Sequence, residues 1–141
     1  MKLNLSRRLL TLLACTGLLL TTACRSEVAE QPETTAPQLL AVAEAKTLPV
    51  AHQNLVILDV RTAQEFSEGH LNGARNLDVK AEGFEQGLQQ LDKNTPYLVY
   101  CASGRRSQAA TAQMRQAGFG KVYELNGGIQ AWQGAGEPVT K

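Results

Sequence analysis

Two short, almost continuous apolar runs constrain the fold of this chain most strongly. Residues 55–60 (LVILDV) and 97–100 (YLVY) consist largely of apolar side chains, and the first run is rich in β-branched residues. Runs of this length and composition are typical of strands that are buried on both faces of a parallel sheet. Residues 122–125 (VYEL) and the shorter run 74–77 are further strand candidates.

Helical patterns separate these strands along the chain. The candidates are residues 62–68, 81–91, 107–117 and 129–133. Thr62 and Glu65 have the spacing of a capping box, and Phe84, Leu88 and Leu91 recur on one helical face. Strands that alternate with helices predict an α/β domain with a mainly parallel central sheet flanked by helices. We place this domain at residues 38–141.

The first 23 residues have the pattern of a secretory signal peptide. Three basic residues (Lys2, Arg7 and Arg8) precede a twelve-residue apolar stretch at 9–20. That stretch is shorter than the roughly 20 residues that span a bilayer, but it fits the hydrophobic region of a signal peptide. Residues 24–37 are polar and contain prolines, so we expect a flexible tether there.

Small residues directly before Cys24 resemble the lipobox of bacterial lipoproteins. In that family the cysteine sulfur is acylated and becomes the new N-terminus, although Thr21 stands here where the family usually has Leu. Cleavage before Cys15 would leave an apolar stretch of only about six residues. We therefore predict lipidation of Cys24 and a membrane anchor on the periplasmic side of the cell envelope. The alternative is ordinary cleavage after Ala23, which would release a soluble periplasmic protein.

The charge of the chain gives no sign of a nucleic-acid partner. Without the first 23 residues, 11 basic residues stand against 13 acidic ones. Neither a basic stripe nor an acidic tail is present in this part of the sequence. We therefore expect no nucleic acid among the partners.

Cys101 is the strongest candidate for a reactive group. It follows the second apolar strand and precedes a helix, where ligands gather in parallel sheets and where a helix N-terminus favours an anion. Such a position lowers the pKa of a thiol and stabilises the reactive thiolate. Gly104 would allow a tight turn, and Ser107 could cap the helix. The candidate substrate-binding residues are Ala102, Ser103, Gly104, Arg105, Arg106 and Ser107.

The other cysteines strengthen this interpretation. If Cys15 is removed with the signal peptide and Cys24 is acylated, Cys101 is the one free thiol of the mature protein. No internal disulfide is then possible, and with only His52 and His70 beside it we expect no zinc site, no other metal and no cofactor. The plainer alternative is an inert cysteine at the end of a core strand.

Three segments of the chain resemble the signatures of the rhodanese family. They are residues 101–107 (CASGRRS), residues 58–61 with 65–66 and 69–74, and residues 126–129 with Trp132. The first is similar to the active-site motif C-x-x-G-x-R-S/T, and the likeness extends over about residues 39–132. In style the chain is most similar to single-domain periplasmic rhodaneses of the phage-shock type. The resemblance implies a rhodanese-like α/β fold.

The resemblance also implies a sulfurtransferase of the thiosulfate type. The Cys101 thiolate would attack thiosulfate or a similar small donor, release sulfite and hold the sulfur as a persulfide. Cyanide, a small thiol or a protein thiol would then accept that sulfur. Backbone amides of residues 102–106 would stabilise the persulfide anion, and Arg105 and Arg106 would attract the anionic donor.

Four further residues receive supporting roles. Asp59 and Arg61 would lie at the same sheet edge as the loop, where they could orient it or form a structural ion pair. His70 is interpreted as a hydrogen-bonding turn residue rather than as a general base. Trp132 is expected to pack in the core.

Two other functions fit parts of the pattern. A persulfide carrier or binding module would keep the Cys101 loop without fast turnover. Phosphatases and arsenate reductases related to the family also use a loop from cysteine to arginine. Their loop has five residues between the two, whereas residues 102–105 leave four here. The shorter loop suits a sulfur atom better than a tetrahedral phosphate.

Overall fold

The computed structural model describes residues 37–141 of the chain. The predicted signal peptide, the predicted lipid attachment at Cys24 and nearly all of the predicted tether lie outside the described residues. Across residues 37–141, no helix combines the length and apolar character that crossing a membrane requires.

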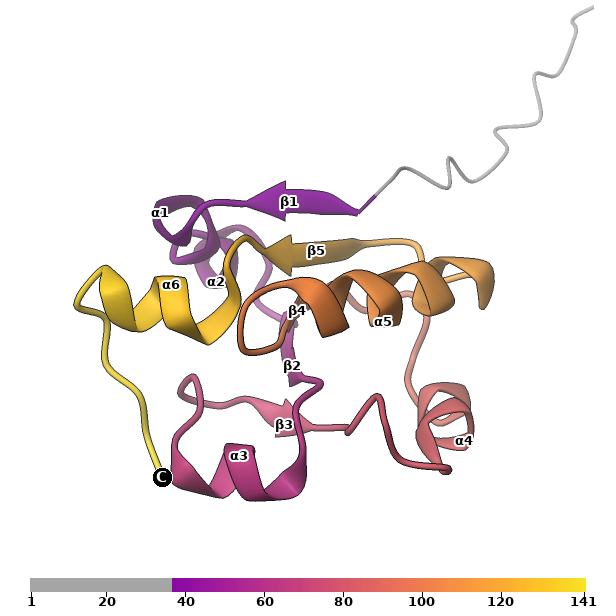
Figure 1. Ribbon diagram of the computed structural model, residues 1–141. Helices are drawn as coiled ribbons and strands as arrows, with labels where there is room; N and C mark the ends of the chain where they lie inside the picture. Colours follow the sequence, from indigo (N-terminus) through magenta and orange to yellow (C-terminus); the bar gives the residue numbers. More distant parts are fainter. Residues whose placement is uncertain (1–36) are drawn as a thin grey trace, which may run out of the picture.

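A five-stranded sheet forms the centre of the domain (Figure 1). Its strands, in spatial order, are β1 (Gln38–Leu40), β5 (Val122–Leu125), β4 (Tyr97–Tyr100), β2 (Val56–Asp59) and β3 (Arg75–Asn76). Every neighbouring pair is parallel. The predicted α/β fold with a mainly parallel sheet is therefore confirmed.

Helices cover both faces of this sheet. One face packs against α4 (Phe84–Gln89) and α5 (Arg105–Gln116), and the other against α1 (Val42–Ala45), α2 (Leu48–Ala51) and α6 (Gly128–Gly134) (Figure 1). The short helix α3 (Ala63–Glu68) follows β2.

The two faces of the central strand divide the core. In β4, Tyr97 and Val99 belong to the cluster under α4 and α5, whereas Leu98 and Tyr100 belong to the opposite cluster. All four are fully buried, as expected for a central parallel strand with a continuous apolar sequence.

The structure differs from the sequence-based prediction at three places. Strand β1 and the single-turn helices α1 and α2 were not predicted, because three or four residues are too few to show a period. The helix predicted for residues 81–91 is confined to α4. The third difference lies at the start of α5, which begins at Arg105 rather than at Ser107.

The carboxyl ends of three strands meet at one edge of the sheet. Strand β2 pairs with β4 so that Asp59 lies beside Tyr100, and β4 pairs with β5 along its other side. The residues that follow these strands, among them Arg61, Cys101 and Gly127, are thereby brought to the same edge. Ligands bind at this edge in open parallel sheets.

Candidate active site

Cys101 lies at the floor of the loop between β4 and α5. Only 1% of its surface is exposed. Gly104 ends the loop with φ 102°, in the left-handed region that favours glycine, and helix α5 starts at the next residue. The loop therefore folds back over the sulfur, and the first turn of the helix faces it.

Hydrogen bonds from the loop stabilise the anionic form of this sulfur. The amide of Gly104 donates to Sγ at 3.1 Å, and the hydroxyl of Ser107 lies 3.6 Å from it. Burial alone would raise the pKa of the Cys101 thiol. Hydrogen bonds from the Ser107 amide and hydroxyl, and then from the amides of Ser103 and Gly104, outweigh burial and lower the pKa below its ordinary value. Thiolate is the reactive form of cysteine.

Ser107 does not cap the helix as predicted. The N-cap residue is Gly104, which has a left-handed backbone conformation, and Ser107 lies inside the first turn of α5. Its fully buried hydroxyl lies 2.9 Å from the carbonyl oxygen of Gly104 and 2.7 Å from Glu124 Oε1. The side chain thus points beneath the loop, between the sulfur and strand β5.

Glu124 was not among the predicted site residues. It is the third residue of β5 and is 5% exposed. Its position two residues after Val122 places it on the face of the sheet that packs against α5. The signal in the sequence is a lone carboxylate at an inward position of an apolar strand, which is uncommon without a polar partner.

The two predicted arginines of the loop have different surroundings. Arg106 forms two contacts of 2.6 Å with the carboxylate of Glu65, whereas Arg105 is exposed. The hydrogen bond from Arg106 holds the pKa of Glu65 at about 2, and Glu65 in turn raises the pKa of Arg106. Arg106 is therefore part of an ion pair at the loop, and Arg105 is a solvent-exposed charge.

An open pocket of about 730 Å³ lies in front of the sulfur. Its walls are the loop residues Cys101, Ala102, Ser103, Arg105 and Arg106, together with Glu65 and Lys80. Lys80 and Glu65 were not predicted as site residues; Lys80 lies in an irregular segment without a recognisable motif. Three cations against one carboxylate make this mouth electropositive.

Helix α6 supports the loop from behind. Its amides at Ile129 and Gln130 donate to the carbonyl oxygens of Cys101 and Ala102, at 2.9 and 3.1 Å. This close approach requires glycine at position 128, since a Cβ there would lie within 2.8 Å of the Ala102 carbonyl oxygen. The Asn-Gly-Gly sequence, whose last residue begins α6, therefore determines how closely this helix packs against the loop.

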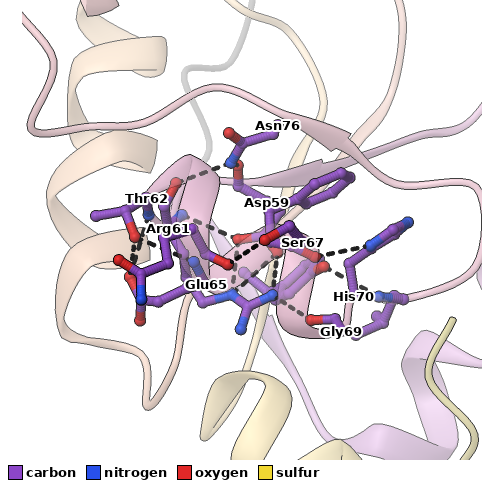
Figure 2. A network of polar contacts seen from close by, with 12 residues as sticks. Asp59, Arg61, Thr62, Glu65, Ser67, Gly69, His70 and Asn76 are labelled. Carbon is purple, nitrogen blue, oxygen red and sulfur yellow. Dashed lines mark hydrogen bonds and ion pairs between the residues drawn. The ribbon is translucent and has the colours of Figure 1, made fainter. Parts of the chain in front are cut away.

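Asp59 and Arg61 form a buried ion pair beside the loop (Figure 2). Arg61 Nη2 donates to Asp59 Oδ2 at 2.6 Å and to the carbonyl oxygen of Gly69 at 2.7 Å. Burial lowers the pKa of Arg61, but the hydrogen bonds and charge of Asp59 reverse that and raise it. Asn76 donates to the carbonyl oxygens of both residues, and the whole network holds the turn after β2.

His70 and Trp132 have structural contacts. His70 stacks on Phe66 at a centroid distance of 3.8 Å, and its Nδ1 lies 3.0 Å from the Phe66 carbonyl oxygen. Its backbone also pairs with Thr140 near the C-terminus. Trp132 is half-buried against the core, and its Nε1 donates to the carbonyl oxygen of Pro138.

The fold and this cysteine loop define the class of the protein. The family model for the rhodanese-like domain matches residues 41–135, and the chain belongs to that family. It is 36% identical over 98 residues to the thiosulfate sulfurtransferase GlpE of Shewanella oneidensis, an alignment that covers 70% of this chain and 88% of the relative. With the GlpE of Ectopseudomonas mendocina it shares 36% identity over 78 residues, covering 55% of this chain and 70% of the relative.

Solved structures agree with this assignment. The rhodanese-like domain of the Alr3790 protein from Anabaena sp. superposes with a TM-score of 0.64 at 30% identity, covering 75% of this chain and 80% of that domain. A rhodanese-related protein from Thermoplasma volcanium gives a TM-score of 0.63 at 27% identity, covering 73% of this chain and 97% of that one.

Proposed function

We propose that the protein is a sulfurtransferase that carries sulfane sulfur on Cys101. Thiosulfate, or a similar small anionic donor, supplies the sulfur, and cyanide, a small thiol or a protein thiol accepts it. The observation that carries the proposal is the sulfur of Cys101 at the floor of a loop that lowers its pKa, beneath an electropositive pocket. The named thiosulfate sulfurtransferases among its relatives support the choice of donor.

The reaction proceeds in two displacements. The Cys101 thiolate attacks the outer sulfur of thiosulfate, a new S–S bond forms, and the bond to the inner sulfur breaks to release sulfite with the electron pair. The terminal sulfur of the persulfide now bears the negative charge. A nucleophilic acceptor then attacks that terminal sulfur and breaks its bond to Cys101, which regenerates the thiolate.

The loop supplies two kinds of stabilisation for this chemistry. Backbone amides directed at Sγ, among them that of Gly104 at 3.1 Å, stabilise the sulfur anion before the attack and after release. Arg105 and Lys80 at the pocket mouth attract a divalent anion. The ion pair of Arg106 with Glu65 keeps the first turn of α5 in place beneath them.

Mass spectrometry of the intact protein tests the proposal. After treatment with thiosulfate, the mature domain gains the mass of one sulfur atom, and addition of cyanide removes it with release of thiocyanate. Cys101→Ser and Cys101→Ala abolish both changes. An unchanged mass in the wild-type protein, at full thiol content, would overturn the proposal.

The same experiment separates the alternatives. A persulfide that forms but is not passed on at a useful rate would identify a carrier. Hydrolysis of a phosphate ester without sulfur loading would identify a phosphatase. The shape of the loop supports sulfur transfer, because four residues between Cys101 and Arg106 enclose a single sulfur atom between the Gly104 amide and the Ser107 hydroxyl.

We also propose that the enzyme works at the periplasmic face of the cell envelope, anchored by a lipid on Cys24. The basic, apolar and small-residue segments of residues 1–23 support this location. Cys24→Ala is expected to move the protein from the membrane fraction to the soluble fraction, whereas Cys15→Ala leaves it in the membrane. Persistence of the Cys24→Ala variant in membranes would contradict the anchor.

A further inference from the structure

We infer that Glu124 is a positioning residue for Cys101: its carboxyl group accepts the thiol proton through Ser107 and then orients the Ser107 hydroxyl toward the sulfur anion. The inference deepens the proposed function, since it concerns how the nucleophile of the same site is formed. It concerns a residue of the strand beneath the loop rather than the loop motif itself.

The three groups form a continuous buried chain. Glu124 Oε1 lies 2.7 Å from Ser107 Oγ, which lies 3.6 Å from Cys101 Sγ. Glu124 is 5% exposed, Cys101 is 1% exposed, and Ser107 is completely buried. A proton can therefore pass from the sulfur to the carboxylate without entering solvent. The S–H bond breaks, Ser107 receives that proton while giving up its own, and an O–H bond forms on Glu124.

The single hydrogen of the Ser107 hydroxyl couples the two ends of this chain. When Glu124 is ionised, Ser107 donates to the carboxylate and cannot donate to the sulfur. When Glu124 is protonated, its O–H donates to Ser107 Oγ and orients the hydroxyl, so the Ser107 hydrogen points at the charged sulfur in preference to the neutral Gly104 carbonyl oxygen 2.9 Å away. A donated hydrogen bond also strengthens the one that the acceptor makes in turn. A neutral Glu124 thus favours the thiolate, and an ionised Glu124 opposes it.

The surroundings of Glu124 favour the neutral carboxyl group. Burial raises its pKa, and hydrogen bonds from Ser107 and Thr111, which favour the carboxylate, do not reverse that direction. The neighbouring residues on the adjacent strands, Leu39 of β1 and Val99 of β4, carry no charge. Two other titratable or charged groups face Glu124. Cys101 lies on the other side of Ser107. Arg115 of α5 lines a surface pocket together with Glu124 but forms no salt bridge with it.

Two substitutions of Glu124 distinguish its two possible protonation states, because each state predicts a different change in the thiol pKa of Cys101. Glu124→Gln keeps a hydrogen-bond donor to Ser107 without a charge, and Glu124→Met keeps the volume without the donor. If the proton resides on Glu124, the thiol pKa of Cys101 stays unchanged in Glu124→Gln. In Glu124→Met no donor orients the Ser107 hydroxyl, so its hydrogen turns to the Gly104 carbonyl oxygen and the sulfur anion loses that hydrogen bond. The thiol pKa then rises, and the thiolate population below that pKa falls roughly fivefold. If Glu124 were a carboxylate beside a thiol, both substitutions would lower the thiol pKa.

The pKa is measured by ultraviolet absorbance of the thiolate and by the rate of iodoacetamide alkylation against pH. Alkylation should titrate in two steps in the wild-type protein, one for Cys101 and one for Glu124, and in a single step in Glu124→Gln. Infrared spectroscopy should show a carboxylic-acid C=O band at a pH where Cys101 is already thiolate, and Glu124→Gln should remove that band. Glu137→Gln is the matched control, because that carboxylate pairs with Lys46 at the surface, and it should leave the titration as in the wild type.

These measurements use no sulfur donor, so their outcome is independent of the sulfurtransferase assay. A thiol pKa that falls in both Glu124 variants, or that moves in neither, would overturn the inference. Sulfur loading could then still be intact. Conversely, an absence of sulfur loading together with the two-step titration would remove the proposed function and leave the proton pair in place.

Discussion

Arg106 and Glu65 join two helices that lie far apart in the sequence. Both guanidinium Nη atoms contact the two carboxylate oxygens at 2.6 Å, although the two residues are 41 positions apart in the sequence. The pair links the first turn of α5, which forms the wall of the cysteine loop, to α3, which follows β2. Glu65 also closes the capping box with Thr62, so one carboxylate fixes both the start of α3 and the loop (Figure 2).

Glu65→Gln should make the domain less stable in a manner that depends on pH. The pKa of Glu65 is lowered to about 2 from 4.5, so its stabilising contribution is complete above the unfolded-state value and disappears as the pH falls toward 2. The difference in free energy of unfolding between wild type and variant should therefore shrink over that interval. Urea denaturation at several pH values measures it. Glu68→Gln, on the same helix but exposed, should show no such trend.

Arg61→Leu should destabilise the domain strongly. It leaves the fully buried carboxylate of Asp59 without its partner, and removal of one member of a buried ion pair costs about 3–5 kcal/mol. Adding Asp59→Asn to this variant should restore part of the loss, because the unpaired charge is gone. Chemical denaturation measures both. Two single variants whose effects simply add would show that the pair is not coupled.

The arrangement of the sheet was predictable, since the buried strands carry continuous apolar sequences. Residues 55–60 and 97–100 were identified as strands because parallel strands bury both faces, and β2 and β4 lie within those ranges. Thr62 was likewise recognised as a cap from its spacing to Glu65. Such features are local: the residues that determine them are neighbours in sequence.

The surroundings of the sulfur were only partly predictable. The position of Cys101 at the end of a buried strand and the role of Gly104 in the turn follow from local sequence. Glu65, Lys80 and Glu124 reach the site through the packing of α3, an irregular segment and β5 against the loop. No period or spacing brings residues from three separate segments together, so only the tertiary structure shows them. The predicted helix cap at Ser107 was wrong for a related reason. Serine is a common N-cap residue, but the fold of the loop puts Gly104 at that position.

Lys80→Ala and Arg105→Ala should each weaken binding of the sulfur donor. Both side chains are exposed at the pocket mouth, so each attracts thiosulfate through solvent, and KM for thiosulfate should rise about two- to fivefold. The effect should diminish as ionic strength increases, because exposed charges are screened. Steady-state kinetics at two salt concentrations measure it. Lys93→Ala, which removes a cation near α4 away from this pocket, is the control and should leave KM unchanged.

Gly128→Ala should displace the cysteine loop and lower the stability of the domain. Gly128 has φ 59°, and a Cβ there would collide with the backbone of Cys101 and Ala102, whose carbonyl oxygens accept hydrogen bonds from α6. Strain and displacement together should cost more than about 2 kcal/mol, and the thiol pKa of Cys101 should move toward its ordinary value as the loop amides turn away. Denaturation and alkylation rates measure the two effects. Gly134→Ala, at the end of the same helix with free space around it, should change stability by less than about 1 kcal/mol. A Gly128→Ala protein with wild-type stability and thiol pKa would show that α6 does not shape the loop.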